Sequence, residues 1–330
     1  MPSKVTICVP VYGVEKYIER CARSLFEQTY ASIDYIFVDD RSPDNSIEIL
    51  KKVISDYPNR MESVRIIKHE VNKGLSGARN TAVENCETEF IMHVDSDDYI
   101  DLNTVEECLI NQQLTNSDIV TYGVVRIKNG ISNVVVYDWV DDKAEMLKRL
   151  LRHQIGHGVC GRMIRTSLYK DHNIKVEVGR GMSEDLQVTP RLFYYSNKLT
   201  YISNVHYYYY LDNEQSYVSS FSIEKFRDQM KARDLIRSFF RDQNVYLNAF
   251  EEATFISLAN NIKGCARVKA PYSVYKEVRS YFDSLKYNYY SKLDIPSRLT
   301  VSIQNYTLLK IYVYFSWHIK NSFRKIVSQF

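Results

Sequence analysis

The sequence is poor in cysteine and has no CxxC pair. Its six cysteines, at positions 8, 21, 86, 108, 160 and 265, are spread thinly over 330 residues. This spacing gives no sign of a disulfide framework and is typical of buried thiols in a reducing compartment. The seven histidines show no HExxH or related spacing, so the sequence also gives no sign of a zinc site.

The chain also lacks long hydrophobic runs and a strong charge of one sign. Without a stretch of about 18 uncharged apolar residues, no membrane-spanning helix is expected. Met1 to Pro10 contains one lysine and a β-branched run broken by Pro10, which does not resemble a secretory signal. The net charge of +3 is too small to indicate nucleic-acid binding. We therefore expect a cytoplasmic globular protein.

The first third of the chain alternates mostly apolar β-branched runs with helical patterns. Runs of this kind are typical of strands buried on both faces of a mostly parallel α/β sheet, in which ligands bind at the carboxyl ends of the strands. We expect strands at Val5–Val9, Tyr35–Val38, Val64–Ile67 and Phe90–Val94, and helices near 15–28, 46–57, 74–83 and 103–113. Strand-like pieces then cover 118–139, a helix 143–153 and a strand 207–210, and the chain is helical after Ser222.

Acidic residues follow two of the expected strands, as Asp39-Asp40 and Asp95-Ser96-Asp97-Asp98. Carboxylates two positions apart, such as Asp95 and Asp97, can both reach one Mg²⁺ or Mn²⁺ ion, which fills its other positions with water or phosphate oxygens. An isolated DxD is more often a polar turn with helix-capping aspartates.

This DxD is accompanied by other groups that suit a nucleotide. Asp40 is placed to accept the imide N–H of a uracil, and Tyr12 to stack on the base. Phosphate is favoured near a helix start by backbone N–H groups and by side-chain charge, and this is where Asn72, Lys73 and Arg79 lie. Each residue has an ordinary structural explanation, but together they predict a nucleotide-diphosphate site.

Five sequence motifs, which follow one another in chain order, together resemble the N-terminal half of family 2 glycosyltransferases. They are Cys8-Val9-Pro10-Val11-Tyr12, Gln28-Thr29-Tyr30, Val38-Asp39-Asp40-Arg41-Ser42-Pro43-Asp44, Asn72-Lys73-Gly74-Leu75-Ser76-Gly77-Ala78-Arg79-Asn80 and Asp95-Ser96-Asp97-Asp98. The resemblance is strong over about 4–110 and weaker to about 220. The family usually has Gly where this chain has Arg41, and often Asn where it has Gly13.

The resemblance implies the GT-A fold, which is α/β and Rossmann-like with a mostly parallel central sheet and flanking helices. It also implies a nucleotide-sugar donor, with UDP favoured, and Mn²⁺ or Mg²⁺ as cofactor. Asp97 would be the direct metal ligand, with Asp95 near the ribose or metal, and Asp98 would be a capping residue. The implied donor-binding residues are Pro10, Tyr12, Asp40, Asn72, Lys73, Arg79, Asp95 and Ser96.

Transfer to an alcohol needs a base, because a protonated sugar hydroxyl is a poor nucleophile. Family 2 enzymes carry a Glu-Asp pair in the acceptor half, and Gly181-Met182-Ser183-Glu184-Asp185-Leu186 matches it here. We assign Asp185 as the base of a single displacement, for which the resemblance implies inversion, and Glu184 as a residue that supports the base or starts the helix. Two acids at a helix N-terminus are also favoured by its dipole alone. His206 is a candidate further metal ligand, although a lone His on a strand is more often structural. Arg162 is a candidate phosphate or acceptor contact, with a surface arginine as the alternative.

The last part of the chain is basic and amphipathic. From Pro296 onward it has five Lys or Arg residues and no Asp or Glu. At helical spacing one apolar stripe contains Leu308, Ile311, Tyr312, Phe315, Ile319, Phe323, Ile326 and Phe330. This pattern predicts either a helix lying on a membrane surface or a helix docked on the catalytic domain with a solvated basic face.

These observations favour a three-part chain: a nucleotide-sugar-binding half at 1–110, an acceptor-binding half at 111–220 and a C-terminal helical extension at 221–330. We expect a UDP-sugar-dependent inverting glycosyltransferase of bacterial surface-polysaccharide synthesis. Its acceptor would be a glycan or polyprenyl-linked glycan, and it would be cytoplasmic or peripheral on the inner face of the membrane. The alternative is a catalytically silent GT-A-like adaptor. Two other enzyme classes fit less well. A nucleotidyltransferase would need a Gly-rich N-terminal loop, and a haloacid-dehalogenase-type phosphatase would need a DxD after the first strand. Pro10-Val11-Tyr12 stands at that place in this chain.

Overall fold

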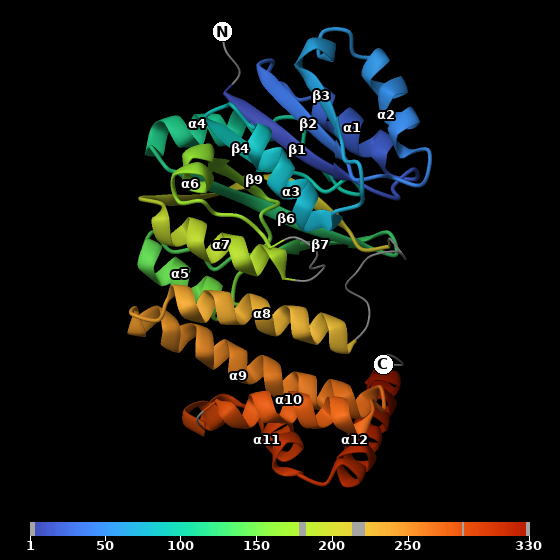
Figure 1. Cartoon of the computed structure of the whole chain (residues 1–330), viewed down its shortest axis with the longest axis vertical. Coiled ribbons are helices and arrows are strands. Elements are labelled where there is room, and N and C mark those ends of the chain that lie inside the picture. Colours follow the sequence, from blue (N-terminus) through green and yellow to red (C-terminus); the bar gives the residue numbers. More distant parts are fainter. Residues whose placement is uncertain (1–3, 178–182, 213–221, 286, 328–330) are drawn as a thin grey trace. The chain divides into compact units, whose positions relative to one another are not determined.

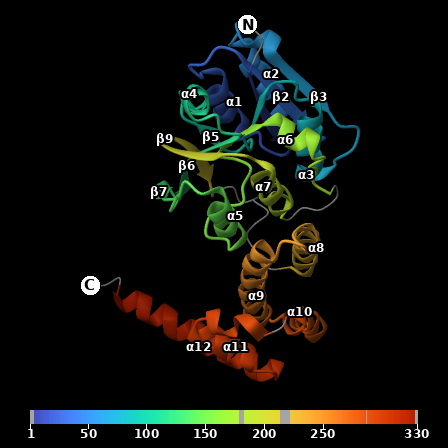
Figure 2. The same cartoon turned by 90° about the vertical axis from the view of Figure 1, so that its left-hand side faces the viewer.

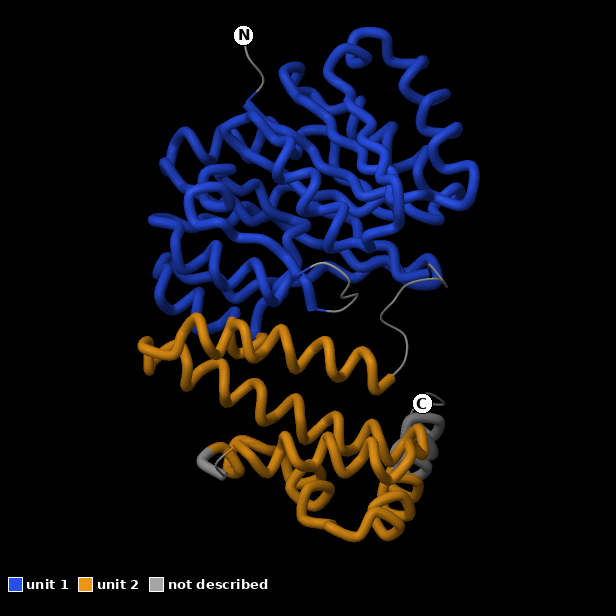
Figure 3. The backbone as a smooth tube through the Cα atoms, viewed as in Figure 1, with its two compact units in different colours: residues 1–150, 154–218 blue, residues 151–153, 219–330 orange. Residues whose placement is uncertain are grey.

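The computed structural model describes residues 4–177, 183–212, 222–285 and 287–327, with the side chains of 287–288 and 317–327 left out. Two compact units make up the chain (Figure 3). The first contains residues 1–150 and 154–218, and the second residues 151–153 and 219–330. Gly181, Met182 and Phe330, named in the sequence motifs above, lie outside the described residues.

The first unit begins with four parallel strands in the order β3-β2-β1-β4 (Figure 1). Figure 2 shows α1 and α4 on one side of this sheet and α3 on the other. The order reverses at β1, because β2 and β3 follow on one side of it and β4 lies on the other. The elements are β1 (Val5–Val11), α1 (Ile18–Phe26), β2 (Ile33–Asp39), α2 (Ser46–Ser55), β3 (Val64–Lys68), α3 (Gly74–Asn85) and β4 (Phe90–His93).

The rest of this unit extends the same sheet with mixed strand directions. β8 is antiparallel to both β4 and β6, β9 is parallel to β6, and β5 and β7 pair antiparallel with β9 and β6. Only the first half of the sheet is therefore fully parallel. The elements are β5 (Tyr99–Ile100), α4 (Thr104–Thr115), β6 (Ile119–Lys128), β7 (Ile131–Val135), α5 (Lys143–Leu151), β8 (Arg162–Arg165), α6 (Thr166–Asp171), α7 (Glu184–Tyr195) and β9 (Leu199–Tyr210).

The core of the first unit explains why these segments are strands. Ile7 and Val9 on β1 and Phe37 on β2 are fully buried, and they pack with the apolar stripe of α1 formed by Ile18, Cys21 and Leu25. Burying each aliphatic or aromatic side chain contributes about 1.5–3 kcal/mol. Residues on both faces of β1 are buried, so this strand is held as a rigid base for the loop that follows it.

The second unit is helical throughout its described residues. It consists of α8 (Ile223–Phe239), α9 (Asn244–Arg267), α10 (Tyr272–Ser284), a short 3₁₀ segment (Tyr287–Lys292), α11 (Ile295–Ser302) and α12 (Tyr306–Val327). The long helix α9 packs against α8, α10, α11 and α12. Its buried Phe255, Leu258 and Ile262 form one core with Val278 and Phe282 of α10.

Candidate active site

Three neighbouring parallel strands, β1, β2 and β4, end at the same edge of the sheet. Because the strand order reverses between β1 and β4, this edge is where an α/β sheet forms a ligand-binding crevice. Tyr12 follows β1, Asp40 follows β2, and Asp95 lies two residues after β4. The side chain of Tyr12 is 52% exposed, so its ring is accessible at this edge.

Asp40 anchors the start of α3. Its Oδ1 accepts hydrogen bonds from the backbone N–H of Lys73, at 2.8 Å, and lies 2.6 Å from His69 Nδ1. The other ring nitrogen of His69 lies 2.8 Å from Thr81 Oγ1 on α3. Asp40 is only 3% exposed, so the structure shows a role in positioning α3 beside the predicted role in base recognition. Asn72 and Lys73 themselves are exposed at the helix start.

The loops after β1 and β2 hold each other in place. Gly13 N–H donates to Ser42 Oγ at 2.9 Å, and Ser42 Oγ in turn contacts Asp44 Oδ1 at 2.7 Å. Arg41 has φ of 66°, in the left-handed region that glycine adopts without strain. This geometry explains why the resembling family usually has glycine at this position.

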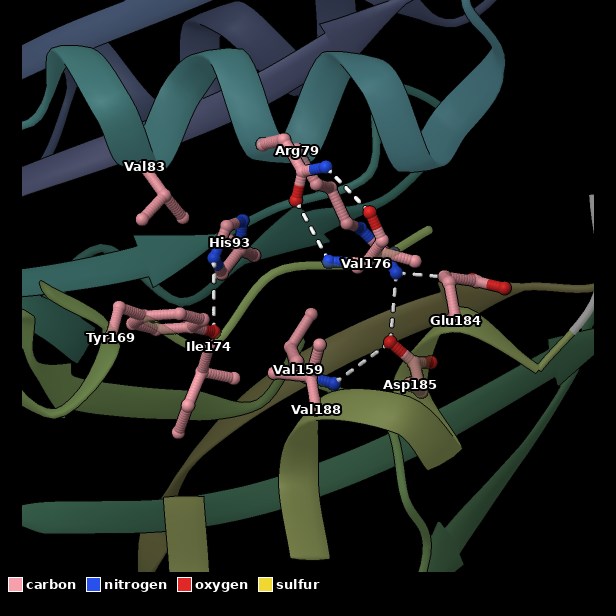
Figure 4. A pocket seen from close by; sticks show the side chains of 11 residues that line it. Arg79, Val83, His93, Val159, Tyr169, Ile174, Val176, Glu184, Asp185 and Val188 are labelled. Carbon is pink, nitrogen blue, oxygen red and sulfur yellow. Dashed lines mark hydrogen bonds and ion pairs between the residues drawn. The ribbon is translucent and has the colours of Figure 1, made fainter. Parts of the chain in front are cut away.

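Arg79 on α3 joins the two halves of the site (Figure 4). Its Nη2 contacts Asp95 Oδ1 at 2.9 Å, and its Nη1 contacts Glu184 Oε1 at 3.0 Å and Asp185 Oδ1 at 2.7 Å. Arg79 is 6% exposed. One buried guanidinium therefore holds a residue of the predicted donor site and the predicted catalytic base in a single cluster, called here the Arg79 cluster.

The cluster carries more negative than positive charge, and this shifts the pKa values of its members. Burial raises the pKa of the Asp185 carboxyl, which Arg79 lowers in part and Asp95 raises again. Burial and the neighbouring Asp185 raise the pKa of Glu184. Burial alone would lower the pKa of Arg79, but the surrounding carboxylates raise it well above its ordinary value. A carboxylate with a raised pKa is a stronger base, as proton abstraction requires.

A pocket borders the Arg79 cluster on the α6–α7 side (Figure 4). Arg79, Glu184 and Asp185 supply its charged groups, and Val159 and Val188 part of its apolar wall. The backbone N–H of Val159 lies 3.4 Å from Asp185 Oδ1 and helps to orient the carboxylate.

The four residues after β4 divide into open and buried side chains. Asp95 and Asp97 are partly exposed, whereas Ser96 and Asp98 are buried. The predicted capping role of Asp98 is wrong: its carboxyl accepts from Tyr207 Oη and from the backbone N–H of Tyr210, both on β9. Burial and the two neighbouring aspartates raise the pKa of Asp98 to about 9.

Asp95 and Asp97 fit a divalent cation that is shared with a diphosphate. Mg²⁺ is usually bound by one or two carboxylates, with phosphate and water oxygens completing its coordination. No group of three or more His, Cys, Asp or Glu within the described ranges is arranged to hold a metal ion. His206 pairs with Asp101 instead, through its backbone N–H at 2.8 Å and its ring at 3.3 Å, so it adds no third ligand to this pair.

Arg162 does not reach the open site. It is 2% exposed, donates to the carbonyl of Gly156 at 2.7 Å and lies over the ring of Phe193. Its burial lowers the pKa of the guanidinium. The expected phosphate or acceptor contact is therefore replaced by a structural role beneath α7.

A family model described as "Glycosyl transferase family 2" matches residues 6–172, half of the chain. The chain belongs to glycosyltransferase family 2. The matched residues include β1 from Thr6 onward, β2 to β4, α3 and all of the predicted donor-site residues.

Among curated relatives of this family 2 chain, poly(ribitol-phosphate) beta-N-acetylglucosaminyltransferase TarS of Staphylococcus aureus is 28% identical over 220 residues, covering 66% of this chain and 37% of that protein. The uncharacterized glycosyltransferase EpsJ of Bacillus subtilis is 40% identical over 119 residues, covering 36% of this chain and 33% of that protein. The chain thus spans about a third of the length of these relatives.

Similarity to solved structures shows that this chain has the GT-A fold. A fragment of S. aureus TarS, residues 1–349 in complex with UDP-GlcNAc, matches with a TM-score of 0.71 and 20% identity, covering 98% of this chain and 92% of that one. The mannosyltransferase PcManGT from Pyrobaculum calidifontis, in complex with GDP-Man and Mn²⁺, matches with a TM-score of 0.55 and 14% identity over 98% of this chain and 88% of that one. At these identities the likeness concerns the fold alone.

The sequence reasoning missed two parts of this family 2 site. His69 was not expected to orient Asp40, although its position directly after β3 places it at the same sheet edge. The bridge from Arg79 to Glu184 and Asp185 spans more than a hundred positions and has no local sequence signal.

Proposed function

We propose that this chain is an inverting glycosyltransferase that moves a sugar from a UDP-sugar to a hydroxyl of a glycan or lipid-linked acceptor in bacterial surface-polysaccharide synthesis. The observation that carries this proposal is the Arg79 cluster, in which Asp95 and Asp185 both form ion pairs with the guanidinium of Arg79. A donor phosphate beside Asp95 and an acceptor hydroxyl beside Asp185 would then meet at one point. Membership of family 2 supports the same reaction class.

UDP-GlcNAc is the donor to test first. The TarS fragment of similar fold is described in complex with UDP-GlcNAc and with UDP. Two relatives are named as transferases acting on poly(ribitol phosphate), one for N-acetylglucosamine and one for glucose. These names support a UDP-hexose donor and a polyol-phosphate or glycan hydroxyl as acceptor.

In the proposed mechanism Asp185 takes the proton of the acceptor hydroxyl while the oxygen of that hydroxyl attacks the anomeric carbon of the donor sugar. The bond from that carbon to the phosphate oxygen breaks, UDP leaves from the opposite face, and the configuration inverts. Asp95 and Asp97 would hold the divalent cation, which when bound neutralises charge on the leaving diphosphate. Asn72 and Lys73, exposed at the N-terminus of α3, would receive the phosphates, and Tyr12 would stack on the base.

The donor site is tested by thermal unfolding with UDP, GDP, CDP or TDP, each with Mn²⁺, Mg²⁺ or EDTA. A ligand at about 100 times its Kd adds about 2.7 kcal/mol to the native state. We expect UDP with a divalent cation to raise the Tm of the wild type, and Asp97→Ala to abolish that rise. If no nucleotide shifts the Tm of the folded protein, the donor site is wrongly assigned.

The base is tested by transfer from UDP-GlcNAc to poly(ribitol phosphate) in the Asp185→Asn variant. Removing a general base lowers kcat by about 10²–10⁴-fold, while UDP binding should persist. Asp171→Asn, at an exposed position on α6, is the matched control and should keep full activity. Undiminished transfer by Asp185→Asn would refute the base assignment. A wild type that binds UDP without transfer or hydrolysis of the donor would support the adaptor function instead.

A further inference from the structure

α12 is docked in the second unit through one side of the helix. Leu309 and Val313 are almost fully buried in the core formed with α9 and α10. Tyr306 packs on the Tyr275 ring, with centroids 4.3 Å apart, and its hydroxyl donates to the carbonyl oxygens of Cys265 and Ala270 at 3.0 and 2.7 Å. Tyr306, Leu309 and Val313 form the inner face of the helix, and this face is fully occupied.

The opposite side of α12 is also apolar, but it is exposed to solvent. Leu308 is 58% exposed, Ile311 49%, Tyr314 56% and Phe315 59%. At about 100° per residue these four span an arc of about 120°, centred roughly opposite the inner face. We call them the outer face of α12. The sequence left open whether the predicted stripe docks on the protein or faces a membrane. Of its residues, Leu308, Ile311 and Phe315 point away from the core, and Tyr312 packs against it.

The charge of α12 indicates which kind of surface covers the outer face. Over its 22 residues the helix carries Lys310, Lys320, Arg324 and Lys325 and no Asp or Glu. Two copies of the helix packed on this face would carry eight cations between them and no compensating acid. An anionic surface would complement both the exposed apolar side chains and the positive charge. A helix of this length lies about 33 Å along such a surface.

We propose that the outer face of α12 binds an anionic lipid surface, with the helix lying in the plane of the membrane interface. Apolar and aromatic side chains inserted below the headgroups, with Lys and Arg on the other side of the helix attracted to the anionic surface, are the pattern of interfacial amphipathic helices. The helix does not span the bilayer, since none of the helices in the described ranges is both long enough and apolar enough to do so. Docking by the inner face and lipid contact by the outer face occur together on one helix.

The test is vesicle flotation of the full chain. Vesicles of phosphatidylcholine with about 40 mol% phosphatidylglycerol are compared with phosphatidylcholine alone, at about 0.1 and 0.5 M NaCl. We expect the protein to float with the anionic vesicles, with at least about tenfold weaker partitioning on neutral vesicles or at the higher salt. These readouts require neither a sugar donor nor transfer, so they are independent of the proposed function.

The variant Leu308→Ser/Ile311→Ser/Phe315→Ser replaces three of the four outer-face side chains without touching the core. We expect it to keep the wild-type circular dichroism spectrum and to lose about tenfold or more in partitioning to anionic vesicles. Ile131→Ser/Val134→Ser/Val136→Ser changes three exposed apolar residues on and directly after β7 and is the matched control that should still bind.

Three results would overturn the proposal. The wild type could fail to float with anionic vesicles, or it could float equally with neutral vesicles at both salt concentrations. The outer-face variant could bind as tightly as the wild type, which would place lipid binding elsewhere. Analytical ultracentrifugation could instead show a dimer that the outer-face variant converts to a monomer, which would make the face a contact between copies of this chain.

Discussion

Replacing Arg79 with methionine removes the one cation that three carboxylates share. Methionine keeps most of the apolar volume of the side chain, so the variant isolates the charge. Removing one partner of a buried ion pair costs about 3–5 kcal/mol, because the remaining charges are left uncompensated. The side chains of Asp95, Glu184 and Asp185 are 27%, 14% and 28% exposed, so water screens part of this cost. We expect a loss near the lower end, about 3 kcal/mol, at pH 8.

The loss should depend on pH in a direction set by the carboxyls. Arg79 lowers the raised pKa values of Glu184 and Asp185, so without it these two pKa values rise further and the folded protein takes up protons that the unfolded chain does not. Stability then recovers as pH falls, by about 1.4 kcal/mol per pH unit for each such carboxyl. Urea unfolding of Arg79→Met and wild type at pH 8 and pH 5.5 measures both the loss and its recovery.

Arg23→Met is the matched control. Arg23 also has three partners, Glu19, Asp56 and Tyr57, but its side chain is 38% exposed. Water screens exposed ion pairs of this kind, so this variant should stay close to wild type at both pH values. A loss below about 1 kcal/mol for Arg79→Met at pH 8, or a loss that does not change with pH, would refute the argument that Arg79 compensates the site.

Three further changes test other parts of the first unit. Arg41→Gly should raise the free energy of unfolding by about 1 kcal/mol in a urea titration, since it relieves the left-handed φ of 66°; an unchanged or lower value would contradict this. Burial lowers the pKa of His93 to about 3, so between pH 8 and pH 5.5 the unfolded chain gains a proton that the folded protein does not. Wild-type stability should fall by about 1.4 kcal/mol from this group over that range, and His93→Phe should flatten the pH dependence; an equal slope in the variant would refute this. Gly77→Ala would place a Cβ 2.3 Å from Lys73 Cβ, which disturbs the hydrogen bond from Lys73 N–H to Asp40. We therefore expect a smaller UDP-induced rise in Tm in this variant. An undiminished rise would show that the helix start tolerates the methyl group.

The local pattern of apolar and polar residues was enough to predict much of the fold. The expected strands near residues 5, 35, 64 and 90 lie within one or two residues of β1 to β4. Burial leaves mostly apolar runs in β1, β2 and β4, whereas the edge strand β3 is only partly buried. The helix expected from Gly74 begins at that residue, and the described chain after Ser222 consists of helices joined by short loops. The meeting of Tyr12, Asp40 and Asp95 at one edge of the sheet follows from parallel strand order, which alternating strands and helices imply.

Long-range packing decided the rest, because contacts between distant segments leave no periodic signal in the sequence. Arg79 reaches Glu184 and Asp185 only because α3 and α7 both border the end of β4. Asp98 is a buried acceptor for β9 and not a cap, since β5 and β9 pair beside it. The apolar pattern of α12 showed that the helix has a hydrophobic side, but only the packing of Tyr306, Leu309 and Val313 on α9 and α10 determined which side remains exposed.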